Sequence, residues 1–166
     1  MNANRLLKLR MILVVTPVLT VVLTASAGAA GKKPRPTPDA EFKALMARYY
    51  EAWNTLDLNQ PDRFYAKDAD LVHYDIAPLK YRNWSEYRAG VKQLFEQFST
   101  FKLIPNDDLR VSRRGTIAWV TLTLRLSGVQ KDGKQMNLDA RHTAVWEKRG
   151  GQWLIVHEHV STPLPG

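Results

Sequence analysis

The sequence predicts an α+β domain in which a curved antiparallel sheet is covered on one face by helices. Three observations predict this class. Apolar residues recur at spacings of three and four between residues 38 and 98, as in amphipathic helices. From Phe101 onward they alternate with polar residues, as in strands with one buried face. The helical segments precede the strands, and this order is typical of α+β domains.

Two amphipathic helices are expected, and a short strand between them. The first starts at Pro38, a residue suited to the first helical position. Its apolar face consists of Phe42, Leu45, Met46, Tyr49, Trp53 and Leu56. A short second helix follows Asn59, and residues 70–76 predict a short strand. The other long helix starts at Asn83, where Glu86 has the spacing of a capping box.

Three long strands form the rest of the predicted sheet. Residues 118–127, 138–147 and 153–161 each alternate apolar and polar side chains. The pair Asp132-Gly133 predicts a hairpin turn between the first two, and residues 149–151 predict a turn before the third. Strands of this length favour a strongly bent sheet.

The first 29 residues have the pattern of a signal peptide. A basic segment ends at Arg10, the apolar run from residue 11 to residue 23 follows, and Ala27 and Ala29 each end an A-x-A cleavage site. An uncleaved signal anchor is the alternative, but the apolar run is shorter than the roughly 20 residues that span a bilayer. We therefore expect a signal peptide over residues 1–29, a leader rich in proline and basic residues over 30–37, and one domain over 38–166.

The expected location is the periplasm or the exterior of the cell. The basic segment has no Arg-Arg pair, and the chain has no cysteine to carry a lipid anchor or a disulfide. Without the three basic residues of the signal, 21 Lys and Arg stand against 16 Asp and Glu, a net charge of +5. These charges are interspersed, which indicates a solvated surface. We expect neither a nucleic-acid partner nor membrane attachment after cleavage.

The C-terminal strands resemble a known family. Residues 143–146 and 149–163 are similar to the last hairpin of SnoaL-like proteins, members of the superfamily of ketosteroid isomerase, scytalone dehydratase and nuclear transport factor 2. They are also similar to the association domain of calcium/calmodulin-dependent protein kinase. Residues 117–120 resemble the preceding strand of that domain, and residues 74–81 resemble a loop of isomerase-like members.

The resemblance implies a cone-shaped, cystatin-like fold: a curved antiparallel sheet around the N-terminal helices, with a pocket at its open end. It does not imply one reaction, because the superfamily includes isomerases, dehydratases, hydrolases, binding proteins and assembly domains.

Alternation on the last strand places His157 and His159 on the same face as Trp153 and Ile155, and Glu158 on the other. The resemblance implies that the Trp153 face points inward. His157 would then be a catalytic acid or base and His159 a ligand donor. The alternative is that both are hydrogen-bonded core histidines. A metal site is not expected, because only His142 or Asp139 could add a third ligand to the pair.

Asp75 is the predicted partner of His157. A carboxylate in an apolar pocket can act as a general base, although a loop-capping role suits Asp75 equally well. The isomerase pattern also requires a hydroxyl and a second acid; Tyr49, Tyr50 and Tyr81 can supply the hydroxyl, but no second acid matches.

Tyr50, Trp53, Tyr81 and Arg141 complete the predicted site. Tyr50 and Trp53 would be walls, whereas Tyr49 is expected in the core. Arg141, if it points inward, would bind a carboxylate or phosphate; otherwise it is an exposed strand charge or pairs with Asp139.

The expected function is a pocket for a small, partly apolar organic ligand, with cofactor-independent isomerase- or dehydratase-type chemistry. The alternative is a non-catalytic periplasmic binding or oligomeric assembly module. Trp119 and other apolar side chains on the outer face of the sheet predict a homodimer.

Overall fold

The computed structural model describes residues 38–164, so the predicted signal peptide (1–29) and leader (30–37) lie outside the described residues. In chain order, the helices and strands are α1 (Pro38–Trp53), α2 (Asn59–Asp62), β1 (His73–Tyr74), α3 (Trp84–Phe95), β2 (Phe98–Pro105), β3 (Arg110–Arg114), β4 (Ile117–Gln130), β5 (Gln135–Arg149) and β6 (Gln152–Ser161). The helices precede the long strands, as predicted.

The strands form one curved, unclosed sheet in the order β1-β6-β5-β4-β2, with β3 also paired to β4. The β2–β4, β3–β4, β4–β5 and β5–β6 pairs are antiparallel. β1 differs from the prediction in two ways. It has only two residues, and it pairs parallel to β6, with His73 opposite Glu158. The sheet is therefore mixed, although its long strands are antiparallel.

Local sequence explains where α1 and α3 begin and end. α1 begins at Pro38 as predicted but ends at Trp53, before Leu56, whose positive φ of 61° is incompatible with a continuing helix. Asn83 caps α3 by accepting the Glu86 backbone N–H over 2.9 Å. In a capping box, the Glu86 carboxylate would accept the backbone N–H of Asn83. Here it accepts the backbone N–H of Arg82, one residue earlier.

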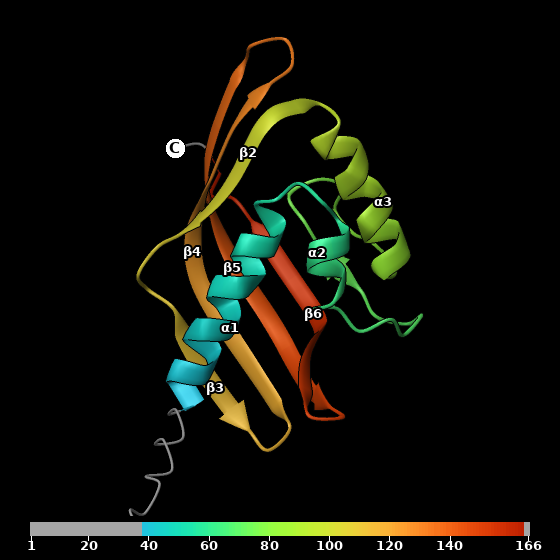
Figure 1. Ribbon diagram of the computed structural model, residues 1–166, viewed down its shortest axis with the longest axis vertical. Helices are drawn as coiled ribbons and strands as arrows, with labels where there is room; N and C mark the ends of the chain where they lie inside the picture. The colour runs from blue at the N-terminus through green and yellow to red at the C-terminus, as the bar shows by residue number, and fades with distance from the viewer. Residues whose placement is uncertain (1–37, 165–166) are drawn as a thin grey trace, which may run out of the picture. The chain divides into compact units, whose positions relative to one another are not determined.

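The helices lie on one face of the sheet. α1 crosses the face formed by β4, β5 and β6, with α2 and α3 beside it, and the β4–β5 hairpin extends past them (Figure 1). The predicted alternation on β4 is confirmed, because the buried set is Ala118, Val120, Leu122, Leu124 and Leu126. The fold class is therefore the expected α+β architecture.

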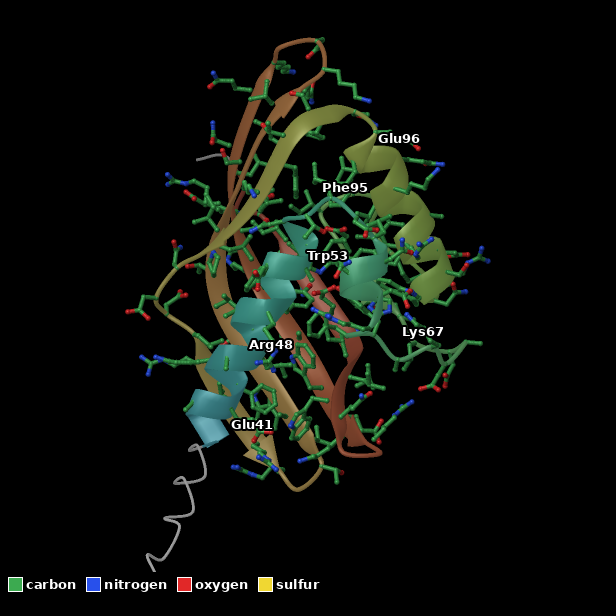
Figure 2. All side chains as sticks on the ribbon, in the orientation of Figure 1. Glu41, Arg48, Trp53, Lys67, Phe95 and Glu96 are labelled. Atoms are coloured by element: carbon green, nitrogen blue, oxygen red, sulfur yellow. The ribbon has the colours of Figure 1, made fainter. Side chains whose placement is uncertain are left out.

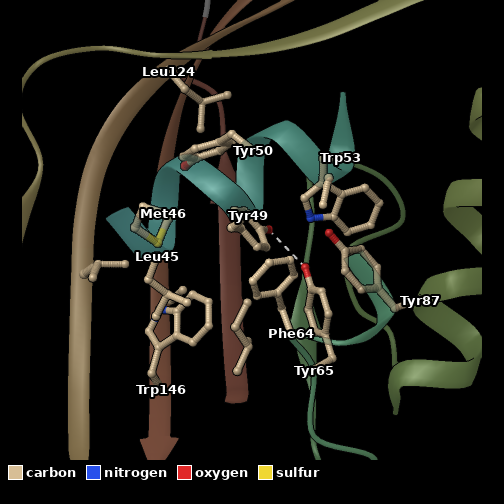
Figure 3. Packing of buried hydrophobic residues seen from close by; sticks show 14 of the residues in the cluster. Leu45, Met46, Tyr49, Tyr50, Trp53, Phe64, Tyr65, Tyr87, Leu124 and Trp146 are labelled. Atoms are coloured by element: carbon tan, nitrogen blue, oxygen red, sulfur yellow. Dashed lines mark hydrogen bonds between the residues drawn. The ribbon is translucent and has the colours of Figure 1, made fainter. Parts of the chain in front are cut away.

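Aromatic side chains fill the space between α1 and the sheet. Tyr49 packs against Phe64 and Trp146 with ring centroids 5.7 and 6.1 Å apart, and its hydroxyl meets that of Tyr65 (Figure 3). Trp153 is buried on the inner face as predicted, 5.0 Å from the ring of Phe42. Within residues 38–164, no helix is both long and apolar enough to cross a bilayer.

Candidate functional site

A cavity of about 60 Å³ lies between α1, α3 and the inner face of the sheet. Its apolar walls include Val91 and Phe95 of α3, Phe101 of β2 and Leu124 of β4. Trp53 of α1 also lines it and packs edge-on against Phe95, with ring centroids 6.1 Å apart; Figure 2 shows both side chains between the two helices. The two predicted walls, Tyr50 and Trp53, therefore do border a cavity.

The polar groups of the cavity come from four elements of the fold. They are Tyr49 and Tyr50 of α1, Asp75 from the loop after β1, Tyr87 of α3 and His142 of β5. Such a space, mainly apolar with a few convergent polar groups, is the usual form of a small-molecule site.

Asp75 is half-buried at the border of this cavity. Burial raises the pKa of its carboxyl from 3.8 to about 7, and the nearby Glu158 acts in the same direction. The Ile76 N–H, which donates to Asp75 Oδ1 over 2.7 Å, and the nearby His142 oppose the rise. The bond to Ile76 also shows that the loop-capping role and the pocket position coexist in one residue.

Behind the cavity, Glu158 is buried and accepts three hydrogen bonds. Tyr65 donates to Oε2 over 2.7 Å, while Tyr49 and His142 donate to Oε1, His142 over 2.7 Å. Burial alone would raise the pKa of Glu158, but the bonds and the facing His142 outweigh it and lower the pKa to about 2. Glu158 is therefore an ionised carboxylate in the core.

His142 connects this carboxylate to the cavity. Its Nε2 faces Glu158, so Nε2 carries a hydrogen and Nδ1 accepts the Tyr50 hydroxyl over 2.6 Å when the ring is neutral. Tyr50, His142 and Glu158 thus form a hydrogen-bonded chain from the cavity wall into the core.

The predicted inward orientation of His157 and His159 is wrong. Val145 pairs with His157 whereas Trp146 pairs with Ile155, so Val156 is an extra residue in β6. This β-bulge reverses the alternation after Ile155. Glu158 therefore points into the core.

The two histidines consequently lie on the outer face of β6. His159 is exposed, and His157 is half-buried with Nδ1 donating to the Val72 carbonyl over 2.8 Å. Tyr74 packs edge-on against both imidazoles, with ring centroids 5.4 and 5.8 Å apart. Neither histidine lines the cavity.

Arg141 and Tyr81 are also outside the cavity. Arg141 is exposed on the outer face of β5, so its predicted inward role is wrong; the neighbouring Asp139 pairs with Arg125 at 3.1 Å. Tyr81 is buried against α3, where a Cβ on Gly90 would lie 2.4 Å from its hydroxyl oxygen. The structure therefore brings together Asp75, Tyr50 and Trp53 from the predicted set.

Sequence reasoning missed the roles of His142 and Glu158. His142 alternates with Ala140 and Ala144 on β5, which was a signal that it points inward. Glu158 had no such signal, because its orientation depends on the bulge. Among residues 38–164, no group of three or more His, Cys, Asp or Glu side chains is arranged to hold a metal ion.

Fold and cavity together describe a small α+β protein with a curved sheet and a mainly apolar internal cavity. A sequence profile of the SnoaL-like domain matches residues 42–165, and the chain belongs to this family. No curated protein sequence matches the chain.

Solved structures show the same fold. A nuclear transport factor 2-like superfamily protein from Salmonella enterica serovar Typhimurium is 20% identical, with a TM-score of 0.69 over 75% of this chain and 90% of that one. A proposed calcium/calmodulin-dependent protein kinase II association domain from Xanthomonas campestris is 23% identical, with a TM-score of 0.67 over 78% and 91%. A proposed dehydratase of the same superfamily from Streptomyces avermitilis is 16% identical, with a TM-score of 0.66 over 78% and 100%.

Proposed function

We propose that the chain binds a small, partly apolar organic ligand in the cavity and that Asp75 performs acid–base chemistry on it without a cofactor. The observation that carries this proposal is the half-buried Asp75 carboxyl at the border of a mainly apolar space, with a pKa of about 7. Such a group is populated in both protonation states near neutral pH, the condition under which general acid–base catalysis is most effective.

The Tyr50–His142–Glu158 chain supports the same function. It places a hydroxyl and an imidazole on the cavity wall, with a buried carboxylate behind them. A ligand hydroxyl near Asp75 can donate to the Tyr50 oxygen, whose own hydrogen is donated to His142, while Glu158 holds the orientation of the His142 ring. This arrangement suits proton removal next to a carbonyl or loss of water from a hydroxyl compound. The likeness to the proposed dehydratase is consistent with the second reaction.

Proton exchange at carbon tests the proposal without knowledge of the natural substrate. The probe is 2-indanone in D₂O, and NMR follows deuterium entering the carbon next to its carbonyl. The wild-type protein should accelerate exchange over buffer, and Asp75→Asn should abolish the acceleration, because an amide is not a base at this pH. Equal exchange by both proteins, or none by the wild type, contradicts a catalytic Asp75.

A non-catalytic binding or assembly module is the second candidate. Trp119 is 37% exposed on the outer face of β4, directly opposite Val145 of β5. This apolar surface, and the likeness to a kinase association domain, favour pairing of two copies through the outer face of the sheet. Sedimentation should detect a homodimer that Trp119→Glu disrupts and Leu79→Glu, in the exposed loop after β1, does not; a wild-type monomer contradicts the assembly.

Export to the periplasm or beyond the cell is part of the proposal. The basic, apolar and small-residue segments of residues 1–29 support it. Mass spectrometry of the exported protein should find an N-terminus just after Ala27 or Ala29, and an intact Met1 in the cytoplasmic fraction alone would contradict export.

A further inference from the structure

A second hollow, of about 430 Å³, lies on the other side of Asp75. Its walls include Tyr74, Ile76 and Leu79 from the chain after β1, and His159 from β6. Asp75 and Val160 line both this outer hollow and the internal cavity. Asp75 therefore borders both spaces.

The outer hollow exposes several large apolar side chains to solvent. Leu79 is 86% exposed, Tyr74 41% and Ile76 37%, all within six residues of chain. The edge-on packing of Tyr74 on His157 and His159 holds its ring in place beside the hollow. Apolar side chains gathered on a concave surface commonly mark a binding site.

The internal cavity is too small to enclose a whole drug-sized ligand. Pockets that enclose a drug-sized ligand are typically about 300–1,000 Å³. The internal cavity, at about 60 Å³, has room only for a compact group. A larger ligand held at Asp75 must extend outward, and the space beyond Asp75 is the outer hollow.

We propose that the outer hollow is a second subsite for the same ligand, and that the ligand is an elongated carbonyl or hydroxyl compound with an apolar group on each side of its oxygen. The compact group enters the cavity, the oxygen meets Asp75, and the second group lies against Tyr74, Ile76 and Leu79. This inference rests on the proposed function, because it takes the internal cavity as the first subsite.

Two ketones that differ only in the second group test the inference. Acetophenone has one ring beside its carbonyl, and benzophenone has a ring on each side. Equilibrium dialysis at about pH 5.5, where Asp75 is protonated and can donate to a carbonyl, gives the affinity of each. The second ring should strengthen binding to the wild type by roughly tenfold, given the apolar area it buries.

Variants separate the subsite from general hydrophobicity. Leu79→Ser should reduce the benzophenone-to-acetophenone affinity ratio to near one. Leu138→Ser, which changes a leucine exposed on β5 and lining neither space, should preserve the wild-type ratio. Melting curves confirm that both variants are folded.

Each other outcome has a distinct meaning. If both ketones bind and Leu79→Ser leaves their ratio unchanged, the outer subsite is wrong while the internal binding site stands. If neither ketone binds the wild type, the proposed function fails and the inference fails with it. Photochemical attachment of benzophenone exclusively to segments far from residues 74–79 and 159–162 also overturns the inference.

Discussion

The His142 imidazole donates its Nε2–H to Glu158 Oε1 over 2.7 Å, and both side chains are buried. The two residues lie on neighbouring strands, β5 and β6, and only the bulge at Val156 brings Glu158 to the face of His142. With the hydroxyls of Tyr49 and Tyr65 as further donors, Glu158 has enough partners to remain ionised in the core.

Glu158→Gln should lower the free energy of unfolding by about 1–3 kcal/mol, because the amide has one acceptor oxygen in place of two and leaves a buried donor without a partner. Urea denaturation at neutral pH measures the loss. Glu51→Gln, at an exposed position on α1, is the control and should change stability by less than about 0.5 kcal/mol. Similar small losses in both variants would show that the buried network contributes little.

Acid should destabilise the wild type through the same carboxylate. The pKa of Glu158 is lowered from 4.5 to about 2 in the folded state. Its stabilising contribution is therefore present above about pH 4.5 and is lost as the pH falls toward 2. Urea denaturation across this window should show a steeper loss for the wild type than for Glu158→Gln. Parallel curves would contradict the lowered pKa.

The sequence allowed the strands to be predicted but not the orientation of the end of β6. Periodicity located β4, β5 and β6, because alternation repeats over many residues. A single extra residue at Val156 reverses which side chains of β6 point inward after Ile155. The sequence does not reveal this reversal, because His157 and His159 alternate with Glu158 and Val160 whether or not the bulge is present. Asp75 was identifiable as a candidate, but its position depends on the parallel pairing of β1 with β6, a contact between distant segments.

Trp153→Ala should destabilise the fold by about 3–5 kcal/mol, because the indole is buried against Phe42 and its removal leaves a cavity. The indole N–H also donates to Glu41 Oε1 over 3.1 Å. Thermal and urea unfolding measure the loss, and Trp153→Phe should recover part of it. An unchanged melting temperature for the alanine variant would contradict the inward position of Trp153.

Gly90→Ala should reduce stability by about 1–3 kcal/mol, although alanine normally favours a helix by up to about 1 kcal/mol over glycine. The added Cβ would lie 2.4 Å from the hydroxyl oxygen of buried Tyr81. Combining Gly90→Ala with Tyr81→Leu should recover part of the loss, as measured by urea denaturation. A stabilised single variant would show that Tyr81 moves aside at little cost.

Asp75→Asn should remove a pH dependence of stability that has the opposite sign to that of Glu158. The pKa of Asp75 is raised from 3.8 to about 7 in the folded state, because burial disfavours the charged form. Its contribution to stability is therefore fully present below about pH 3.8 and is lost as the pH rises through 7. The free energy of unfolding of Asp75→Asn, compared with that of the wild type, should therefore increase when the pH is raised from about 3.8 to about 8.

Paired urea denaturations of the two proteins at the two pH values measure this gain. Asp70→Asn, at an exposed position just before β1, is the matched control and should leave the difference between the two pH values nearly unchanged. A direct NMR titration of the Asp75 carboxyl carbon adds an independent reading and should give a midpoint near 7. A midpoint near 4 would show that water reaches the carboxyl freely, and Asp75 would then lack the near-neutral basicity that the proposed acid–base chemistry requires.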